Sequence, residues 1–262
     1  MAVLAWRGPQ DNTVSIIQTT HLYHRFADDT QGLCDVSLAF NEGEFTVIAG
    51  ANGSGKTTLL RHLNGLLLPE SGAVTVCGKS VEEDPMAARQ QVGMVFQDAD
   101  SQIVGETVYD DAAFGPENLA LGRLQINRRV TRALEAVDLC GFENKRPHHL
   151  SGGEKRRLAI AGVLAMAPRV LLMDEPFSNL DYPATCLVLD QILNLHSNGH
   201  TIIITTHDLE KVVAHAQRLV VMADGRVVED GLPTEVIDGV ARYGIRPPCS
   251  VQLGKGIRPW MS

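Results

Sequence analysis

Apolar runs and longer helical patterns alternate along this chain, and the alternation predicts an α/β fold. Four short runs, rich in β-branched residues and poor in charge, lie at 45–49, 170–173, 200–205 and 219–222. Such runs are typical of strands in a parallel sheet that is covered on both faces. Apolar positions at helical spacing follow or separate these runs, at 57–63, 183–196 and 209–216. We therefore expect helices that pack against a central parallel sheet.

Other parts of the chain depart from this alternation. The pattern predicts strands at 14–19, 34–40, 73–78 and 92–96, joined by polar turns. Between about 105 and 166 the spacing becomes helical. We expect a loose tail at residues 1–13 and an irregular tail at residues 237–262, where Pro247 and Pro248 interrupt regular structure. The folded domain would then span residues 14–236.

The strongest chemical signal lies between the predicted strand at 45–49 and the predicted helix that follows it. Gly50 to Thr57 fits the pattern G-x-x-x-x-G-K-[ST] at every fixed position. Glycines allow backbone N–H groups to converge on phosphate oxygens, and the helix N-terminus adds its own free donors. We expect Lys56 to reach the β- and γ-phosphates and Thr57 to bind Mg²⁺. The remaining loop residues of this predicted nucleoside triphosphate site are Asn52, Gly53, Ser54, Gly55 and Thr58.

Composition narrows the choice of partners and compartment. The formal net charge is −8, from 23 Lys+Arg against 31 Asp+Glu. An acidic balance argues against a surface that follows a phosphate backbone, so we expect no nucleic-acid partner. The five cysteines are scattered and form no C-x-x-C pair, which predicts reduced, mostly buried thiols in the cytoplasm. No apolar run reaches 18 residues, so any membrane role is expected to depend on a partner protein.

A second motif distinguishes among the many proteins that share a phosphate loop. Leu150-Ser151-Gly152-Gly153-Glu154 resembles the signature of the ATP-binding cassette (ABC) family. Ser151 is a good helix N-cap, and a hydroxyl with glycine amides at a helix start can bind an anion. The resemblance implies that Ser151, Gly152 and Gly153 close on the γ-phosphate held by a second subunit. It therefore implies a head-to-tail dimer with two shared ATP sites.

The remaining motifs of the family follow in its usual order. Val170 to Glu175 resembles the Walker B strand, which implies that Asp174 holds Mg²⁺ and that Glu175 is the general base that polarises the attacking water. Ser178 to Asp181 matches the D-loop, which links the two sites across the dimer. His207 matches the switch histidine that contacts the γ-phosphate.

Two more residues are assigned by the same resemblance. Gln97 matches the Q-loop glutamine, which reaches Mg²⁺ or the attacking water and senses the transmembrane partner. Phe26 lies where the family has an aromatic residue stacked on adenine, with Tyr23 and His24 as nearby alternatives. The resemblance covers about residues 14–235. It implies an ATP hydrolase with an α/β P-loop NTPase core, an antiparallel β subdomain, a helical signature subdomain at about residues 98–166, and ATP with Mg²⁺ as ligands.

The segment 98–119 is similar to the ATPases of energy-coupling-factor importers, including those for cobalt and nickel. Gln97, directly before this segment, forms a Q-x(4)-Q pair with Gln102, and the F-G-P…N sequence of that subgroup follows. The similarity implies a transmembrane coupling protein, a membrane protein that captures a transition-metal ion or a vitamin, and a second ATPase subunit, identical or paralogous. The chain would lie at the cytoplasmic face of the membrane. Acidic residues in this segment, Asp110 and Asp111 among them, are expected to form the rim of a groove for an arginine-bearing partner helix.

Several alternatives are left open by the residues. The chain could serve another class of ABC importer, or be a soluble ABC protein that acts on ribosomes or DNA, although it lacks the fused second cassette or long coiled coil of such members. A P-loop small-molecule kinase would leave the LSGGE motif without a purpose. The basic run Lys155-Arg156-Arg157 could be a nucleic-acid patch, but a solvated helix face is the simpler interpretation. The pairs His148/His149 and His196/His200 lack the accompanying ligands of a metal site.

Overall fold

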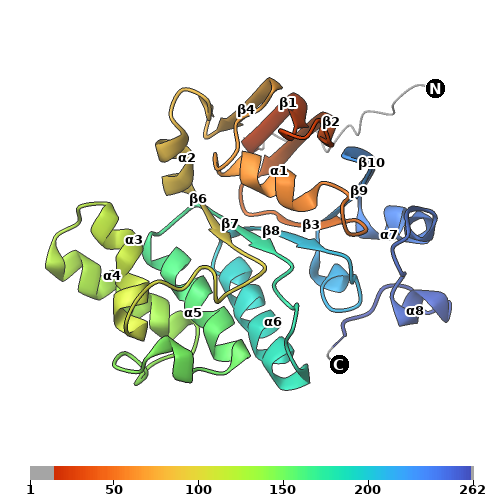
Figure 1. Ribbon diagram of the computed structural model, residues 1–262. Helices are drawn as coiled ribbons and strands as arrows, with labels where there is room; N and C mark the ends of the chain where they lie inside the picture. Colours follow the sequence, from red (N-terminus) through yellow and green to blue (C-terminus); the bar gives the residue numbers. More distant parts are fainter. Residues whose placement is uncertain (1–14, 261–262) are drawn as a thin grey trace.

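The computed structural model describes residues 15–260, in which two sheets lie on either side of one helix (Figure 1). The larger sheet has the strand order β10-β9-β3-β8-β7-β6. Its strands are β3 (Phe45–Ala49), β6 (Val92–Val95), β7 (Val170–Asp174), β8 (Thr201–Thr206), β9 (Arg218–Ala223) and β10 (Arg226–Gly231). All pairs except β9–β10 are parallel. Every residue of β3, β7 and β8 is buried, which confirms the predicted parallel sheet with both faces covered.

The smaller sheet is antiparallel, with the strand order β2-β1-β4-β5. It consists of β1 (Ser15–Arg25), β2 (Gln31–Asn41), β4 (Ser71–Val76) and β5 (Lys79–Ser80). Strands were expected where β1, β2 and β4 lie, although β1 and β2 are longer than the pattern indicated, and β5 was not predicted. The predicted tail at residues 1–13 and the first residue of the predicted strand at 14–19 lie outside the described residues.

Helix α1 (Lys56–Leu63) connects the two sheets through a shared apolar core. Its buried residues Leu59, Leu60 and Leu63 belong to one cluster with residues of both sheets, among them Phe40 of β2 and Ile48 of β3. Burial of a leucine side chain stabilises the fold by about 1.5–3 kcal/mol. The start of α1 is therefore fixed in relation to the edge of the large sheet where its parallel strands end.

The other face of the large sheet carries the remaining long helices (Figure 1). These are α3 (Val108–Asn118), α4 (Arg123–Ala136), α5 (Gly152–Ala165) and α6 (Tyr182–Ser197), while the short α2 (Pro85–Gln91) precedes β6. Helix α5 packs against α3, α4 and α6 and is apolar around most of its circumference, as its buried Leu158, Ile160 and Val163 indicate. Such a helix is held by neighbours on several sides. No helix within residues 15–260 has the length and apolar character needed to cross a membrane.

Three expectations were wrong. The helix predicted at 209–216 is reduced to the 3₁₀ turn Val213–His215, because the backbone departs from helical geometry at Val212, whose φ is −125°. Leu209, Val212 and Val213 are all buried. The segment after residue 236 is not an irregular tail. It follows α7 (Pro233–Val236) with the 3₁₀ helix Ile237–Tyr243 and α8 (Cys249–Gln252), and it places Ile237, Val240 and Ile245 in the main core.

The third wrong expectation concerns the thiols. All five cysteines are free, as predicted, but only Cys34 is buried. Cys77 and Cys186 are partly exposed, and Cys140 and Cys249 are exposed.

Candidate functional site

The phosphate loop lies between β3 and α1 and presents unpartnered hydrogen-bond groups. Gly53 and Gly55 have positive φ angles of 81° and 98°, a conformation that glycine adopts without steric cost. Gly55 is the N-cap of α1 and provides no side-chain cap. The Oγ atom of Ser54 is buried and has no partner within the described residues. A buried hydroxyl and free helix amides at one point fit an anion such as a phosphate.

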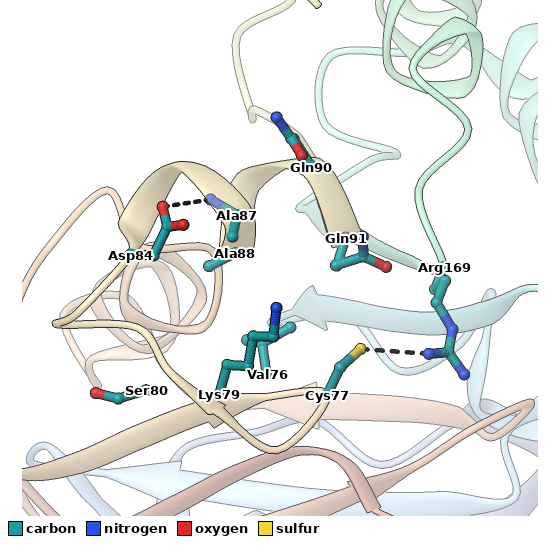
Figure 2. A pocket seen from close by; sticks show the side chains of 10 residues that line it. All are labelled: Val76, Cys77, Lys79, Ser80, Asp84, Ala87, Ala88, Gln90, Gln91 and Arg169. Carbon is teal, nitrogen blue, oxygen red and sulfur yellow. Dashed lines mark hydrogen bonds between the residues drawn. The ribbon is translucent and has the colours of Figure 1, made fainter.

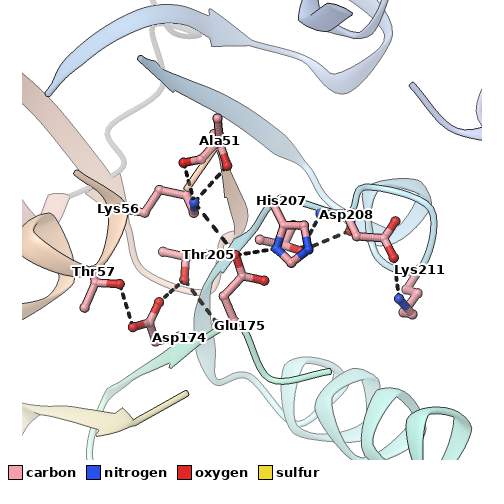
Figure 3. A network of polar contacts seen from close by, with 11 residues as sticks. Ala51, Lys56, Thr57, Asp174, Glu175, Thr205, His207, Asp208 and Lys211 are labelled. Carbon is pink, nitrogen blue, oxygen red and sulfur yellow. Dashed lines mark hydrogen bonds and ion pairs between the residues drawn. The ribbon is translucent and has the colours of Figure 1, made fainter. Parts of the chain in front are cut away.

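Lys56 lies across this loop with its amine buried. Its Nζ donates to the carbonyl oxygens of Gly50 at 2.8 Å and Ala51 at 3.1 Å, and it is 3.8 Å from Oε1 of Glu175 (Figure 3). Burial lowers the pKa of Lys56, and the nearby carboxylates of Glu175 and Asp174 oppose that change. The fold therefore holds a buried cation against the loop, with Glu175 as its ion-pair partner at 3.8 Å.

Asp174, at the end of β7, is held by two threonine hydroxyls. Its Oδ2 accepts from Thr57 Oγ1 at 2.8 Å, and its Oδ1 accepts from Thr205 Oγ1 at 2.5 Å (Figure 3). The parallel register of β7 and β8 sets Asp174 opposite Thr205. A carboxylate beside a hydroxyl is the oxygen set that suits Mg²⁺. The sequence analysis did not assign Thr205 to the site. Alignment of the predicted strands at 170–173 and 200–205 by their ends could have placed it opposite Asp174.

Glu175 lies between Lys56 and His207. Its backbone has a φ of 46°, a left-handed conformation that costs a residue with a side chain roughly 1–2 kcal/mol, and its N–H donates to the Thr205 carbonyl at 3.1 Å. Oε1 of Glu175 is 3.0 Å from Nδ1 of His207 (Figure 3). The Glu175 side chain is 9% exposed and that of His207 is 54% exposed. The carboxylate is thus almost enclosed, and the imidazole separates it from solvent.

Gln97 lines a cavity that also contains Thr57 and Asp174, the two residues whose oxygens suit Mg²⁺. The cavity has a volume of about 510 Å³, and its lining includes Thr57, Gln97 and Asp174. Gln97 itself is exposed. The structure therefore brings together Lys56, Thr57, Asp174, Glu175, His207 and Gln97, as the sequence predicted, while the individual roles stay predictions.

Arg156 and Gln102, whose contacts the sequence did not predict, hold the segment that carries Gln97. Arg156 is buried and donates to the carbonyl oxygens of Phe96 and Gln97, each at 2.5 Å. Gln102 accepts from the Phe96 N–H at 2.9 Å. Interpretation of the Lys155-Arg156-Arg157 run as a solvated face was therefore wrong for Arg156, because the guanidinium points inward from α5. This contact connects the signature helix directly to the end of β6.

Phe26 lies on the turn between β1 and β2 and is 41% exposed. The ring of His24 contacts it edge-on at a centroid distance of 4.8 Å, and the same imidazole contacts buried His62 at 4.8 Å. A Cβ on Gly32 would come within 2.8 Å of the Phe26 ring, and a Cβ on Gly55 within 2.8 Å of the Gly32 carbonyl. Phe26 thus offers a free ring face near the phosphate loop, whereas His24 is occupied by its two neighbours.

The signature motif begins α5 and forms a complete capping box. The Ser151 hydroxyl accepts from the Glu154 N–H at 3.3 Å, and Glu154 Oε2 accepts from the Ser151 N–H at 2.7 Å. The latter bond lowers the pKa of Glu154. A Cβ on Gly152 would meet open space, whereas one on Gly153 would lie 2.7 Å from the Ala184 side chain. Across residues 15–260, no hydrogen bond joins Ser151 to the phosphate loop of its own chain.

A groove of about 730 Å³ lies beside this site, between the β6 region and helices α3 and α5. Large apolar side chains that are exposed line it: Leu66, Met86, Val104 and Phe114. The expected role of Asp111 as a rim carboxylate was wrong, because Asp111 is buried and its Oδ1 accepts from the N–H groups of Val104 at 2.8 Å and Gly105 at 3.0 Å. Burial raises the pKa of Asp111, and the two hydrogen bonds oppose that change. Asp110 is exposed, as expected.

Other candidates are less suited to a ligand. A pocket of about 310 Å³ between β4 and α2 contains none of the predicted residues, and its Arg169 already pairs with Glu42 at 2.6 Å and contacts Cys77 (Figure 2). Among residues 15–260, no three His, Cys, Asp or Glu side chains are grouped so as to hold a metal.

Lys56, Asp174 and Glu175 meet where separate parallel strands end, beside an uncapped helix start, and this arrangement defines a P-loop nucleoside triphosphate hydrolase. A protein-family model described as ABC transporter matches residues 33–178, more than half of the chain. The chain therefore belongs to the ABC transporter ATPase family, whose members hydrolyse ATP.

Relatives support the narrower resemblance as well. The chain is 44% identical over 228 residues to the energy-coupling factor transporter ATP-binding protein EcfA of Methanocaldococcus jannaschii, across 86% of this chain and 82% of that one. It is 40% identical over 225 residues to EcfA of Methanosphaera stadtmanae, across 85% and 81%. Among solved structures, cbiO1 of Clostridium perfringens, part of the ABC transporter complex cbiONQ, has a TM-score of 0.79 at 35% identity, over 92% of this chain and 99% of that one.

Proposed function

We propose that this chain is the ATP-hydrolysing subunit of an importer of the energy-coupling-factor type. The observation that carries the proposal is the enclosed carboxylate of Glu175, 3.8 Å from Lys56 and 3.0 Å from His207, next to the Asp174–Thr57 pair. The named relatives support the transporter class. The cargo we propose is a transition-metal ion such as cobalt or nickel, or a vitamin, captured by a separate membrane protein.

ATP would bind along the phosphate loop with its base on Phe26. The amides of Asn52, Gly53 and Gly55 and the start of α1 with Thr57 and Thr58 would surround the phosphates, and the unpartnered Ser54 hydroxyl would gain a partner. Lys56 now donates to two loop carbonyls, so a short side-chain movement would bring its amine onto the β- and γ-phosphates. The exposed face of Phe26 supports stacking on adenine.

The residues at the ends of β6, β7 and β8 would prepare the attack of water. Thr57 and Asp174, with Gln97 on the same cavity, fit Mg²⁺, which when bound would neutralise charge on the phosphate oxygens. Glu175 would orient the water and accept its proton, because it is an enclosed carboxylate beside the phosphate loop that Lys56 and His207 hold in place. His207 would hold Glu175 in place and contact the γ-phosphate from the solvent side.

A second ATPase subunit, identical or paralogous, would complete each site. Ser151 and Gly152 lie at an exposed helix start with open space in front of Gly152, which supports contact with a phosphate held by another chain. Gly153 would add its amide while its missing side chain admits Ala184.

The groove beside α3 supports a membrane partner. A transmembrane coupling protein would insert a cytoplasmic helix whose apolar side chains cover Leu66, Met86 and Phe114, while a basic residue meets exposed Asp110. Loss of the buried contacts would weaken assembly more than loss of the rim charge. The chain would accordingly lie at the cytoplasmic face of the membrane.

The Glu175→Gln variant tests the hydrolytic assignment. Glutamine keeps the shape of the side chain but cannot accept a proton, so ATP binding should persist while turnover falls by roughly 10²–10⁴-fold. Measurement of both nucleotide affinity and phosphate release distinguishes this from a folding defect. Turnover at the wild-type rate in this variant would contradict the role of Glu175, and an inactive wild-type chain would contradict the proposed function itself.

A further inference from the structure

The segment from Arg246 to Trp260, which we call the strap, runs to the start of α6 from the turn after β8. That turn carries His207, Asp208 and Glu210, and we call it the switch turn. Arg246 pairs with Asp208, directly after His207, in a short parallel bridge. The Cys249 N–H donates to Oε2 of Glu210 at 2.7 Å. The strap ends where the ring of Trp260 lies edge-on to Tyr182, at a centroid distance of 5.1 Å. One continuous segment thus contacts two parts of the site that are distant in the sequence.

The first turn of α6 connects this contact to the signature helix. Asp181 is the N-cap of α6, and its side chain accepts from the Ala184 N–H at 3.0 Å. Tyr182 is the first residue of the helix. Ala184 fills the space that a side chain on Gly153 would need, since a Cβ there would lie only 2.7 Å away. The first turn of α6 therefore lies between Trp260 on one side and the start of the signature helix on the other.

The Trp260–Tyr182 contact lies at the edge of the main core, against which Trp260 packs. Tyr182 is 64% exposed, and Trp260 is partly exposed. Tyr182 contributes little buried area to this pair, but an edge-on aromatic contact does fix the relative orientation of two segments. Its effect should therefore be larger on the geometry of the D-loop, residues 178–181, than on overall stability.

We propose that Trp260 is a positioning residue for the D-loop and the signature glycines, and that the strap connects them to the switch turn. When the contact between His207 and Glu175 changes on nucleotide binding, the turn that carries Asp208 and Glu210 moves the strap. Trp260 then transfers this displacement to Tyr182 and to the helix start against Gly153. The inference rests on the proposed function, because these segments matter to catalysis only if two chains close over ATP.

The fluorescence of Trp260 tests the coupling directly. The chain has two tryptophans, so Trp6→Phe leaves Trp260 as the only indole. In that background with Glu175→Gln added, Mg²⁺–ATP should change the emission of Trp260, and the further change Lys56→Ala should abolish the response. Constant emission while a labelled nucleotide is seen to bind would overturn the proposal without touching the ATPase assignment.

Substitution of Trp260 provides a second, independent readout. Trp260→Ala should lower kcat by about 2- to 10-fold, the effect expected for one aromatic pair, with the affinity of a single chain for ATP unchanged. Trp260→Phe should recover most of the rate, and Tyr182→Ala with Trp260→Ala should be no worse than either alone. Leu253→Ala is the matched control, because Leu253 is a strap residue that is 70% exposed. Additive losses, or an unchanged kcat in Trp260→Ala, would contradict the proposal.

Discussion

Two helices begin with glycines that the family motifs assign to phosphate, and their N-termini differ. Helix α1 starts at Gly55 with no side-chain cap and no acidic residue in its first turn, beside buried Lys56 and the unpartnered Ser54 hydroxyl. Helix α5 starts at Ser151 with a complete capping box, and Glu154 adds a negative charge to its first turn. The start of α1 is therefore suited to bind an anion in a single chain. The start of α5 is already stabilised by its capping box and needs no anion.

The difference indicates that the two helix starts have different roles in nucleotide binding. An uncapped helix start with a buried cation is costly unless an anion occupies it, so the phosphate loop is expected to bind nucleotide in a single chain. The capping box holds α5 in shape while its first amides and the Ser151 O–H remain available as donors. Binding there depends on a charge that arrives with another chain.

Variants at the two helix starts should produce the largest effects and test this division. Lys56→Ala removes the charge that meets the phosphates, so nucleotide affinity and turnover should both fall, the latter by about 10²–10³-fold. Ser151→Arg should leave the affinity of a single chain for ATP intact and abolish turnover, because it blocks only the facing site. Lys79→Ala, an exposed lysine on β5, is the control and should match the wild-type chain.

A mixture of the two variants sharpens the test. Half of the dimers in an equal mixture are mixed, and each carries one intact site, so about a quarter of wild-type turnover should return. Failure to recover any activity, with mixed dimers demonstrated, would mean that the signature does not act on a phosphate held by the other chain.

The sequence predicted the large sheet well because buried parallel strands have an unmistakable composition. The runs at 170–173 and 200–205 correspond to β7 and β8, and the residues that follow them form the centre of the site. The same reasoning failed at 209–216 and after residue 236. There, isolated apolar residues such as Val240 and Ile245 are buried by tertiary contacts, which periodicity along the chain does not reveal.

The candidate site shows the same limit. The phosphate-loop pattern identified Lys56, and the resemblance to the family's motifs identified Asp174 and Glu175. Neither identified Arg156, because a basic run in an acidic chain is usually solvated and only the fold turns this guanidinium toward Phe96 and Gln97. Nor did they separate Asp110 from Asp111, which are neighbours in sequence and opposite in burial.

Helix α1, which follows the phosphate loop, should also make the folded chain less stable at acidic pH, because it carries the buried His62. Burial, with His24 nearby, lowers the pKa of His62 from 6.5 to about 4. Between these values the unfolded chain binds a proton that the folded chain does not, so stability falls as the pH falls through this window. The loss at pH 5 should be about 2 kcal/mol.

Urea unfolding at pH 7.5 and pH 5 measures this effect. His62→Leu should reduce the difference between the two pH values by about 2 kcal/mol, and the remainder is expected from His200 and His215, whose pKa burial also lowers. Replacement of the exposed His148 by Leu should leave the difference unchanged. An equal acid sensitivity in wild-type and His62→Leu chains would locate the titrating group elsewhere.

The smallest effects are expected for the two neighbouring carboxylates of α3, Asp110 and Asp111, which extend the comparison to the helical subdomain. Asp111→Ala leaves the N–H groups of Val104 and Gly105 without an acceptor, so it should destabilise the chain by about 1–3 kcal/mol and disturb the groove. Asp111→Asn should cost much less, because one amide oxygen can replace Oδ1, which accepts both bonds, and a buried charge is removed. Asp110→Ala should leave stability and ATP turnover near wild type and weaken only assembly with a membrane partner, most clearly at low salt. Thermal unfolding, ATPase activity and recovery of the membrane complex, measured on all three variants, distinguish a structural role for Asp111 from a partner-binding role for Asp110. If Asp110→Ala and Asp111→Ala lose the same property to the same degree, the assignment of one to a partner and the other to the fold is wrong.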